Sequence, residues 1–158
     1  MPLTSSDKKD YILRLIEQMR RLVEALLGKL RDGDDAQHDV VEARSLLAQL
    51  LGPMAGLAPR MDSETAGQMV GDPDVLLAWA ELTAAEAELA GARGDEAAAG
   101  ATRRRALELA LEAHLRAPAD RADLLALIAR LRPSVDAKAL AARHAEALGA
   151  LAHGSEAA

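Results

Sequence analysis

Residues 72–117 decide the fold, and they read DPDVLLAWAELTAAEAELAGARGDEAAAGATRRRALELALEAHLRA. Asp72-Pro73 predicts the start of a helix, because aspartate is a favoured N-cap and proline fits the first helical position. Gly94-Asp95 interrupts two long alanine-rich amphipathic patterns, with glycine at a turn and aspartate as the next N-cap. The stretch therefore predicts two antiparallel helices joined by a short turn.

Both helices of this hairpin carry stripes that predict burial. In the first helix the stripe consists of Ala78, Leu82, Ala85, Leu89 and Ala92, with Trp79 at its edge. In the second helix one stripe consists of Leu107, Leu111 and Leu115, and another of Ala99, Ala106, Ala110 and Ala113. Two apolar stripes predict that the second helix is buried on two sides.

Toward the N-terminus, a second hairpin is predicted. Its first helix begins near Ser5 or Ser6 as N-cap, and its apolar residues recur every three or four positions, so one face must be buried. These residues are Ile12, Leu15, Ile16, Met19, Leu22, Val23, Leu26, Leu27 and Leu30. Asp32-Gly33-Asp34 is predicted to end this helix and to cap the next one, which stops before Gly52-Pro53.

The remaining segments are shorter. Between the hairpins, Asp62 is predicted to cap a short helix, and three large apolar residues, Met54, Leu57 and Met61, are expected to pack rather than to form a solvated linker. After Ala117-Pro118 we expect a helix that ends at Arg132-Pro133, and then a last helix capped by Ser134.

One all-α domain of six or seven helices follows from this pattern. Its expected parts are an N-terminal hairpin (1–51), a connector with a short helix (52–71), the central hairpin (72–117), a C-terminal helix pair (118–153) and a tail (154–158). Stacked antiparallel hairpins of this kind predict a tetratricopeptide-like array. No sheet is expected, because residues that favour pleated strands are scarce and phenylalanine is absent.

Composition argues against several classes of function. The formal net charge of −6 opposes sequence-independent nucleic-acid binding, which needs clustered lysine and arginine. Residues 1–10 lack the apolar segment of a signal peptide, and no later apolar run approaches the length of a membrane span. We therefore expect a cytoplasmic protein that contacts neither nucleic acid nor membrane.

Two segments resemble known helical proteins. Around the Gly94-Asp95 turn, three alanines, Ala87, Ala99 and Ala106, match the small-residue positions of a tetratricopeptide repeat. At the N-terminus, DYILRLIEQ (10–18), then LLG (26–28) and the Gly33 turn resemble a bacterial family of small, all-helical, tetratricopeptide-like proteins of unknown function. This resemblance covers about the first third of the chain and implies the helical fold. It implies no catalytic residue.

One cluster has the composition of a metal site. Asp35, His38, Asp39 and Glu42 follow i, i+3, i+4, i+7 spacing, which would place three carboxylates and an imidazole along one helical face. Metal-binding bundles use Glu-x-x-His pairs from two helices, and no second pair exists here. Acidic residues at a helix start are also ordinary partners of the helix dipole. We favour this second interpretation, and we keep a metal-binding module as a minor alternative.

The other titratable residues form no catalytic set. His144 lies within an apolar stripe, where we expect a packed imidazole bonded to a backbone carbonyl. The run Arg103-Arg104-Arg105 fans out around a helix and is expected to be a solvated face, with Arg104 paired to Glu108. No motif with catalytic or phosphate-binding spacing occurs. We therefore expect neither an enzyme nor a cofactor.

The favoured hypothesis is a non-enzymatic scaffold or adaptor that binds a protein partner. The candidate contact residues are those of the solvated face of the first helix and the two aromatics: Tyr11, Arg14, Gln18, Arg21 and Trp79. Tyrosine and tryptophan are enriched among interface hot spots. We expect Trp79 to pack in the core, and for Tyr11 both core packing and contact with a partner stay open. A structural homo-oligomer, in which the first helix pairs with its own copy, is the main alternative.

Overall fold

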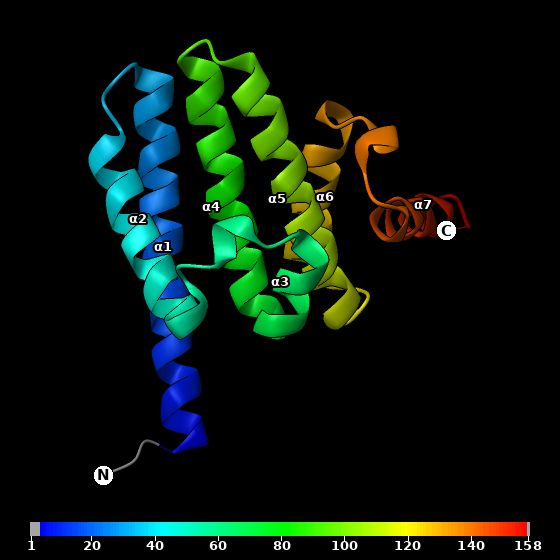
Figure 1. The fold of residues 1–158 in the computed structure, drawn as a ribbon, viewed down its shortest axis with the longest axis horizontal. Coiled ribbons are helices and arrows are strands. Elements are labelled where there is room, and N and C mark those ends of the chain that lie inside the picture. Colours follow the sequence, from blue (N-terminus) through cyan, green and yellow to red (C-terminus); the bar gives the residue numbers. More distant parts are fainter. Residues whose placement is uncertain (1–3, 158) are drawn as a thin grey trace.

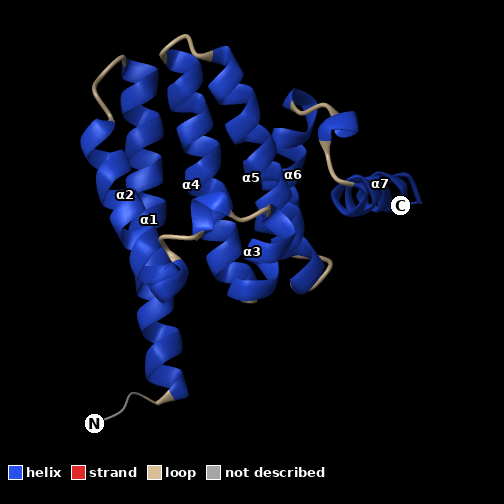
Figure 2. Cartoon of the chain, in the orientation of Figure 1, coloured by secondary structure: helices blue, strands red, loops and turns tan. Residues whose placement is uncertain are grey.

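A computed structural model describes the backbone of residues 4–157 and the side chains of residues 4–152. This part of the chain contains seven α-helices and four short 3-10 helices (Figure 2), and it has no strand, so the all-α prediction is confirmed. The α-helices are α1 (Ser5–Asp32), α2 (Gln37–Leu51), α3 (Ser63–Val70), α4 (Pro73–Ala92), α5 (Glu96–Arg116), α6 (Ala122–Leu131) and α7 (Ala142–Ala157). The 3-10 helices are Gly52–Met54, Ala58–Arg60, Arg132–Ser134 and Ala137–Ala139. Among the helices described, none is both long enough and apolar enough to cross a membrane.

Two antiparallel hairpins, α1–α2 and α4–α5, stand side by side (Figure 1). Helix α4 is central, because it contacts α1, α2, α3, α5 and α6. The short helix α3 packs on α5, α6 covers another side of α5, and α7 lies beyond them and packs mainly against α5. The first turns of α1 extend past the ends of α2 and α4.

Local side-chain caps set most helix starts. Thr4 forms a capping box with Asp7, in which Thr4 Oγ1 accepts from the Asp7 backbone N–H at 3.1 Å. The cap of α1 therefore lies one residue before the predicted Ser5. Asp62, Asp72 and Asp95 each accept a backbone N–H in the first turn of α3, α4 and α5. These three caps are confirmed.

Two predicted boundaries are wrong because the intervening chain forms other turns. Gly33, with φ of 76°, ends α1 in the left-handed conformation, but α2 begins only at Gln37. Asp35, not Asp34, accepts the Gln37 backbone N–H at 2.9 Å. Near the C-terminus, Ser134 ends a 3-10 helix and caps nothing; the last helix starts at Ala142.

The segment predicted as a tail, 154–158, overlaps the last helix. Helix α7 continues through Ala157, so residues 154–157 are helical. Ala158 lies outside the described residues.

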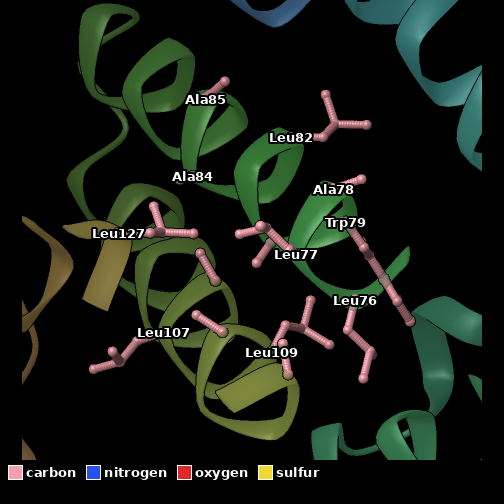
Figure 3. Close-up of a cluster of buried hydrophobic side chains, with 14 of the residues drawn as sticks. Leu76, Leu77, Ala78, Trp79, Leu82, Ala84, Ala85, Leu107, Leu109 and Leu127 are labelled. Carbon is pink, nitrogen blue, oxygen red and sulfur yellow. The ribbon is translucent and has the colours of Figure 1, made fainter. Parts of the chain in front are cut away.

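The first half of α4 is buried on all sides and forms the centre of the core. Six consecutive residues, Val75 to Ala80, are buried, which no single stripe can produce. Figure 3 shows the reason: Leu77 points toward α5, whereas Leu82 points away from it toward other elements. Such a core stabilises the fold through close packing of leucine and alanine.

Three expectations about burial are wrong. Leu57 is 56% exposed and Leu115 is 45% exposed, and Ala92 is exposed as well. Leu57 lies between two 3-10 turns, and the buried residue there is Ala58. Leu115 and Ala92 lie in the last turns of their helices. The other members of the α4 and α5 stripes are buried.

Candidate functional site

Within residues 4–152, the first turns of α1 form the longest run of exposed residues in a helix. Every residue from Thr4 to Tyr11 is exposed, and so is Leu13, at 42%. This segment extends past the neighbouring helices (Figure 1) and is held by the capping box and by continuity with the buried part of α1. It thus presents Tyr11 and Leu13 to solvent on a helix whose backbone is already ordered.

Four of the five predicted contact residues lie on one side of α1. Tyr11, Arg14, Gln18 and Arg21 are all exposed, and their spacing places them on neighbouring turns of the same face. The Tyr11 hydroxyl donates to Gln49 Oε1 of α2 at 3.4 Å, which orients the ring along the α1–α2 boundary. The face is therefore preformed.

A shallow groove of about 420 Å³ follows this face between α1 and α2. Gln18, Arg21 and Leu22 line its α1 side, and the α2 side is formed by Glu42, Ser45 and Leu46. Leu22 and Leu46 give the groove an apolar floor, and the other four side chains provide hydrogen-bonding groups around it. This combination resembles the apolar centre and polar rim of protein interfaces.

The fifth predicted contact residue, Trp79, belongs to a different place. Its side chain is only 7% exposed and forms part of the core of α4, as the favoured interpretation of the sequence had it. The guanidinium carbon of Arg105 lies 5.2 Å from the ring centroid, a cation–π distance. Trp79 is therefore not a surface hot spot and lies instead on the wall of an open cavity.

The predicted metal ligands do not converge. Asp39 points inward, where its Oδ2 lies 2.7 Å from Lys29 Nζ. His38 and Glu42 are exposed, and His38 Nε2 lies 3.0 Å from Glu42 Oε1. The Asp35 carboxylate accepts the Gln37 backbone N–H in the turn before α2. Within the part of the chain that the structure describes, no group of three or more His, Asp or Glu side chains could hold a metal ion.

A buried ion cluster that the sequence did not reveal joins α5 to α7. Glu112 is fully buried, and its carboxylate lies 2.7 Å from Arg116 Nη1, 2.9 Å from Arg143 Nε and 2.6 Å from His144 Nε2. Burial alone would raise the pKa of Glu112, but the hydrogen bonds from Arg143, Arg116 and His144 outweigh it and hold that pKa below the ordinary value. The cluster fixes α7 on α5.

This cluster corrects the expectation for His144. The imidazole is buried, as predicted, but its partner is the Glu112 carboxylate rather than a backbone carbonyl. Gly67 of α3 completes the enclosure, because a Cβ at that position would lie 2.7 Å from Glu112 Oε1. Only one feature of the sequence pointed to a buried Glu112. This residue lies between Leu111 and Ala113 on a helix expected to be buried on two sides.

The arginine run is only partly a solvated face. Arg104 is exposed, as predicted, but Glu108 accepts a hydrogen bond from Ser63 Oγ at 2.9 Å, and no ion pair between Arg104 and Glu108 occurs in the described structure. Arg105 is partly buried against Trp79. Three neighbouring arginines thus have different surroundings because each points in a different direction from α5.

No protein-family model, curated protein or solved structure matches the chain significantly. The resemblance to a bacterial tetratricopeptide-like family, carried by segments 10–18 and 26–28, therefore stays a prediction.

Proposed function

We propose that the protein is a non-enzymatic, cytoplasmic interaction module that binds a protein partner along the exposed face of α1. The partner we envisage presents an amphipathic helix to the α1–α2 groove, with apolar side chains over Leu22 and Leu46. The tetratricopeptide-like stacking of hairpins is part of this proposal. The observation that carries it is the exposed, ordered start of α1, which leads into the groove.

Exposure and order together support this role. An isolated short helix is marginal in water, so a partner that had to order it would lose binding free energy to conformational entropy. Here Tyr11 and Leu13 are already positioned on a capped helix. Apolar anchors on a preordered helix with polar neighbours such as Arg14 and Gln18 suit helix-in-groove recognition.

The same face also supports the alternative of a homodimer. Two copies of α1 pairing across a twofold axis would cover Tyr11 of both chains with one self-complementary surface, whereas Leu13, two positions further on, lies on another side of the helix. In a homodimer the exposed face of α1 would be covered in the purified protein, whereas in a module that binds another protein it would be free.

Light scattering on the purified protein separates them first. A monomer across the accessible concentration range supports a partner of another kind, and a dimer that dissociates in a Tyr11→Ala, Leu13→Ala variant supports self-pairing. A dimer that this variant leaves unchanged would place the contact elsewhere and contradict self-pairing through α1.

Affinity capture with matched variants then tests partner binding. The tagged wild-type protein, a Tyr11→Ala, Arg14→Glu variant and a Leu115→Ala, Arg104→Glu control are used on the same lysate. The control makes equivalent changes at exposed positions of α5. We expect one set of proteins to be retained by wild type and control and lost with the α1 variant. Equal recovery with all three would contradict an α1 binding site.

A further inference from the structure

A second hollow lies on the other flank of α2. It has a volume of about 520 Å³ and is bounded by α2, the connector, α4 and α5. Its wall is largely apolar, with Leu47, Leu51, Ala58 and Trp79 among its lining residues. Exposed Ala48 and Pro59 also line it, so it opens to solvent. Its size falls in the range of roughly 300–1,000 Å³ that is usual for small-molecule sites.

Arg105 is fixed in this cavity by neutral groups. Its Nη1 donates to Ser63 Oγ at 2.9 Å, and its Nη2 donates to the Ala58 carbonyl at 3.1 Å, while the guanidinium packs over Trp79. A guanidinium has five N–H donors, so these two hydrogen bonds leave donors to spare. The contacts hold the planar group in one orientation at the cavity wall.

The charge of Arg105 has no carboxylate in direct contact. Among residues 4–152, no ion pair includes Arg105, and Glu108 reaches it only through the Ser63 hydroxyl. Burial lowers the pKa of Arg105, outweighing the opposite influence of Glu108 and Asp62. A partly buried cation without a direct anionic partner is costly, and a bound anion would offset that cost.

The other arginine of the cavity is already neutralised. Arg44 Nη2 of α2 lies 2.6 Å from Glu86 Oε2 of α4, and both residues line the hollow. The cavity therefore offers one cation without a carboxylate in direct contact, Arg105, and one ion pair, Arg44 with Glu86. This charge balance favours a ligand with a single negative charge over a dianion.

We propose that this cavity binds a small organic carboxylate with an apolar body. The carboxylate accepts hydrogen bonds from Arg105, and the apolar body lies against Leu47, Leu51 and the ring of Trp79. Arginine suits this role because its planar fork matches the two oxygens of a carboxylate. The inference is independent of partner binding at α1, because the two sites use different flanks of α2.

The fluorescence of Trp79 can report ligand binding, because Trp79 is the only tryptophan in the chain and forms part of the cavity wall. We would titrate the purified protein with decanoate, below its micelle-forming concentration, and follow tryptophan fluorescence. Decanol and decyl phosphate serve as the neutral and dianionic comparisons. We expect saturable binding of decanoate that is roughly tenfold or more tighter than that of decanol, as expected for charge-assisted hydrogen bonds.

Two pairs of variants test the assignment. Arg105→Met removes the cation and keeps a long side chain, and Arg104→Met makes the same change at the neighbouring exposed position. Ala48→Phe fills the cavity from an exposed position of α2 without altering the core, and Ala25→Phe is its control on α1. Binding to the Ala48 variant is followed by calorimetry as well, because a new ring near Trp79 can itself change fluorescence.

The expected result is that decanoate binding weakens by about tenfold or more in Arg105→Met and is lost in Ala48→Phe. The two control variants should bind like wild type. If circular dichroism shows that Arg105→Met does not fold, the comparison of Ala48→Phe with Ala25→Phe is used alone to test the proposal. Equal binding of decanoate and decanol, tighter binding of decyl phosphate, or unchanged binding in Ala48→Phe would each overturn the proposal.

Discussion

Helix α4 and the first turns of α1 differ in composition and have opposite surroundings: α4 is rich in alanine and leucine, whereas residues 5–10 are all polar or charged. In α4, most residues are buried, and Leu76 and Leu82 are fully buried. In α1, all residues from Thr4 to Tyr11 are exposed. The comparison shows that a helix in this protein is ordered in two ways: by tertiary packing in the centre, and by capping and continuity at the N-terminal end.

These two kinds of order predict different energetics. A helix held by packing loses stability when volume is removed, because the cavity that remains is not refilled. A helix held by its cap and its continuation is insensitive to loss of exposed side chains, which remain available to bind something else. The α5–α7 contact is a third case, because a buried ion cluster rather than apolar volume fixes it.

The largest effect is expected from removing volume in α4. Leu82→Ala should lower the free energy of unfolding by about 2–5 kcal/mol, since Leu82 is fully buried. Leu13→Ala, the matched change on the exposed part of α1, should alter it by less than about 0.5 kcal/mol. Urea unfolding followed by circular dichroism measures both. Similar losses for the two variants would break the contrast between the helices.

The ion cluster should give an intermediate effect. Glu112→Ala leaves Arg116, Arg143 and His144 without their common acceptor, at an expected cost of about 1–3 kcal/mol. The side chain of Arg143 is 39% exposed and regains water, which limits the loss. Glu146→Ala on exposed α7 is the control. Hydrogen exchange should accelerate in residues 142–152 before it does in α4, and a uniform change would show that the cluster does not specifically hold α7.

Acid should weaken the same contact. Because the pKa of Glu112 is held below its ordinary value of 4.5, the unfolded chain binds the proton more readily than the folded chain. The stabilisation is therefore present above that value and is lost as pH falls toward the lower folded pKa. Urea unfolding of wild type and Glu112→Gln at a series of pH values should show a steeper acid loss in wild type. Parallel pH curves would contradict this assignment.

Glu81 of α4 provides the opposite sign as an internal comparison. Burial raises its pKa despite the nearby Arg20 guanidinium, so the folded chain binds its proton more readily than the unfolded chain. This carboxylate therefore opposes folding as pH rises through its raised pKa. Glu81→Gln should remove this destabilisation. Its effect on the pH dependence of the free energy of unfolding should therefore be opposite in sign to that of Glu112→Gln.

The smallest effect is expected at the cap of α1. Asp7→Ala removes one half of the capping box, which is worth about 0.5–2 kcal/mol to the helix end. Because the first turns unfold locally, global stability should barely change, while hydrogen exchange of residues 5–11 should become faster. Asp10→Ala, an exposed change outside the box, should leave exchange unchanged. Equal exchange in both variants would mean that the box does not order this segment.

Local signals let the sequence predict most of the helix starts. Asp62, Asp72 and Asp95 cap helices through atoms only a few residues away, so their roles can be read from the chain alone. The exposed face containing Arg14 and Gln18 was predicted for the same reason, since helical spacing fixes which residues share a side.

Long-range contacts explain what the sequence missed. Glu112 takes two of its partners from α7, and Arg105 takes its partners from α3 and the connector. Neither set of long-range contacts leaves a local pattern in the sequence. The burial of six consecutive residues in α4 was hidden as well, because alanine and leucine fill most of its positions and blur the boundary between stripes.

Site-specific photocrosslinking tests the central claim, that the exposed α1 face is where a partner binds. A benzoylphenylalanine side chain would replace Tyr11 in one protein, Gln18 in a second and exposed Arg104 of α5 in a third, and each would be irradiated in the lysate used for capture. We predict that positions 11 and 18 crosslink to the same captured protein and that position 104 does not. Crosslinks to that protein from position 104 alone, or from none of the three, would contradict the account.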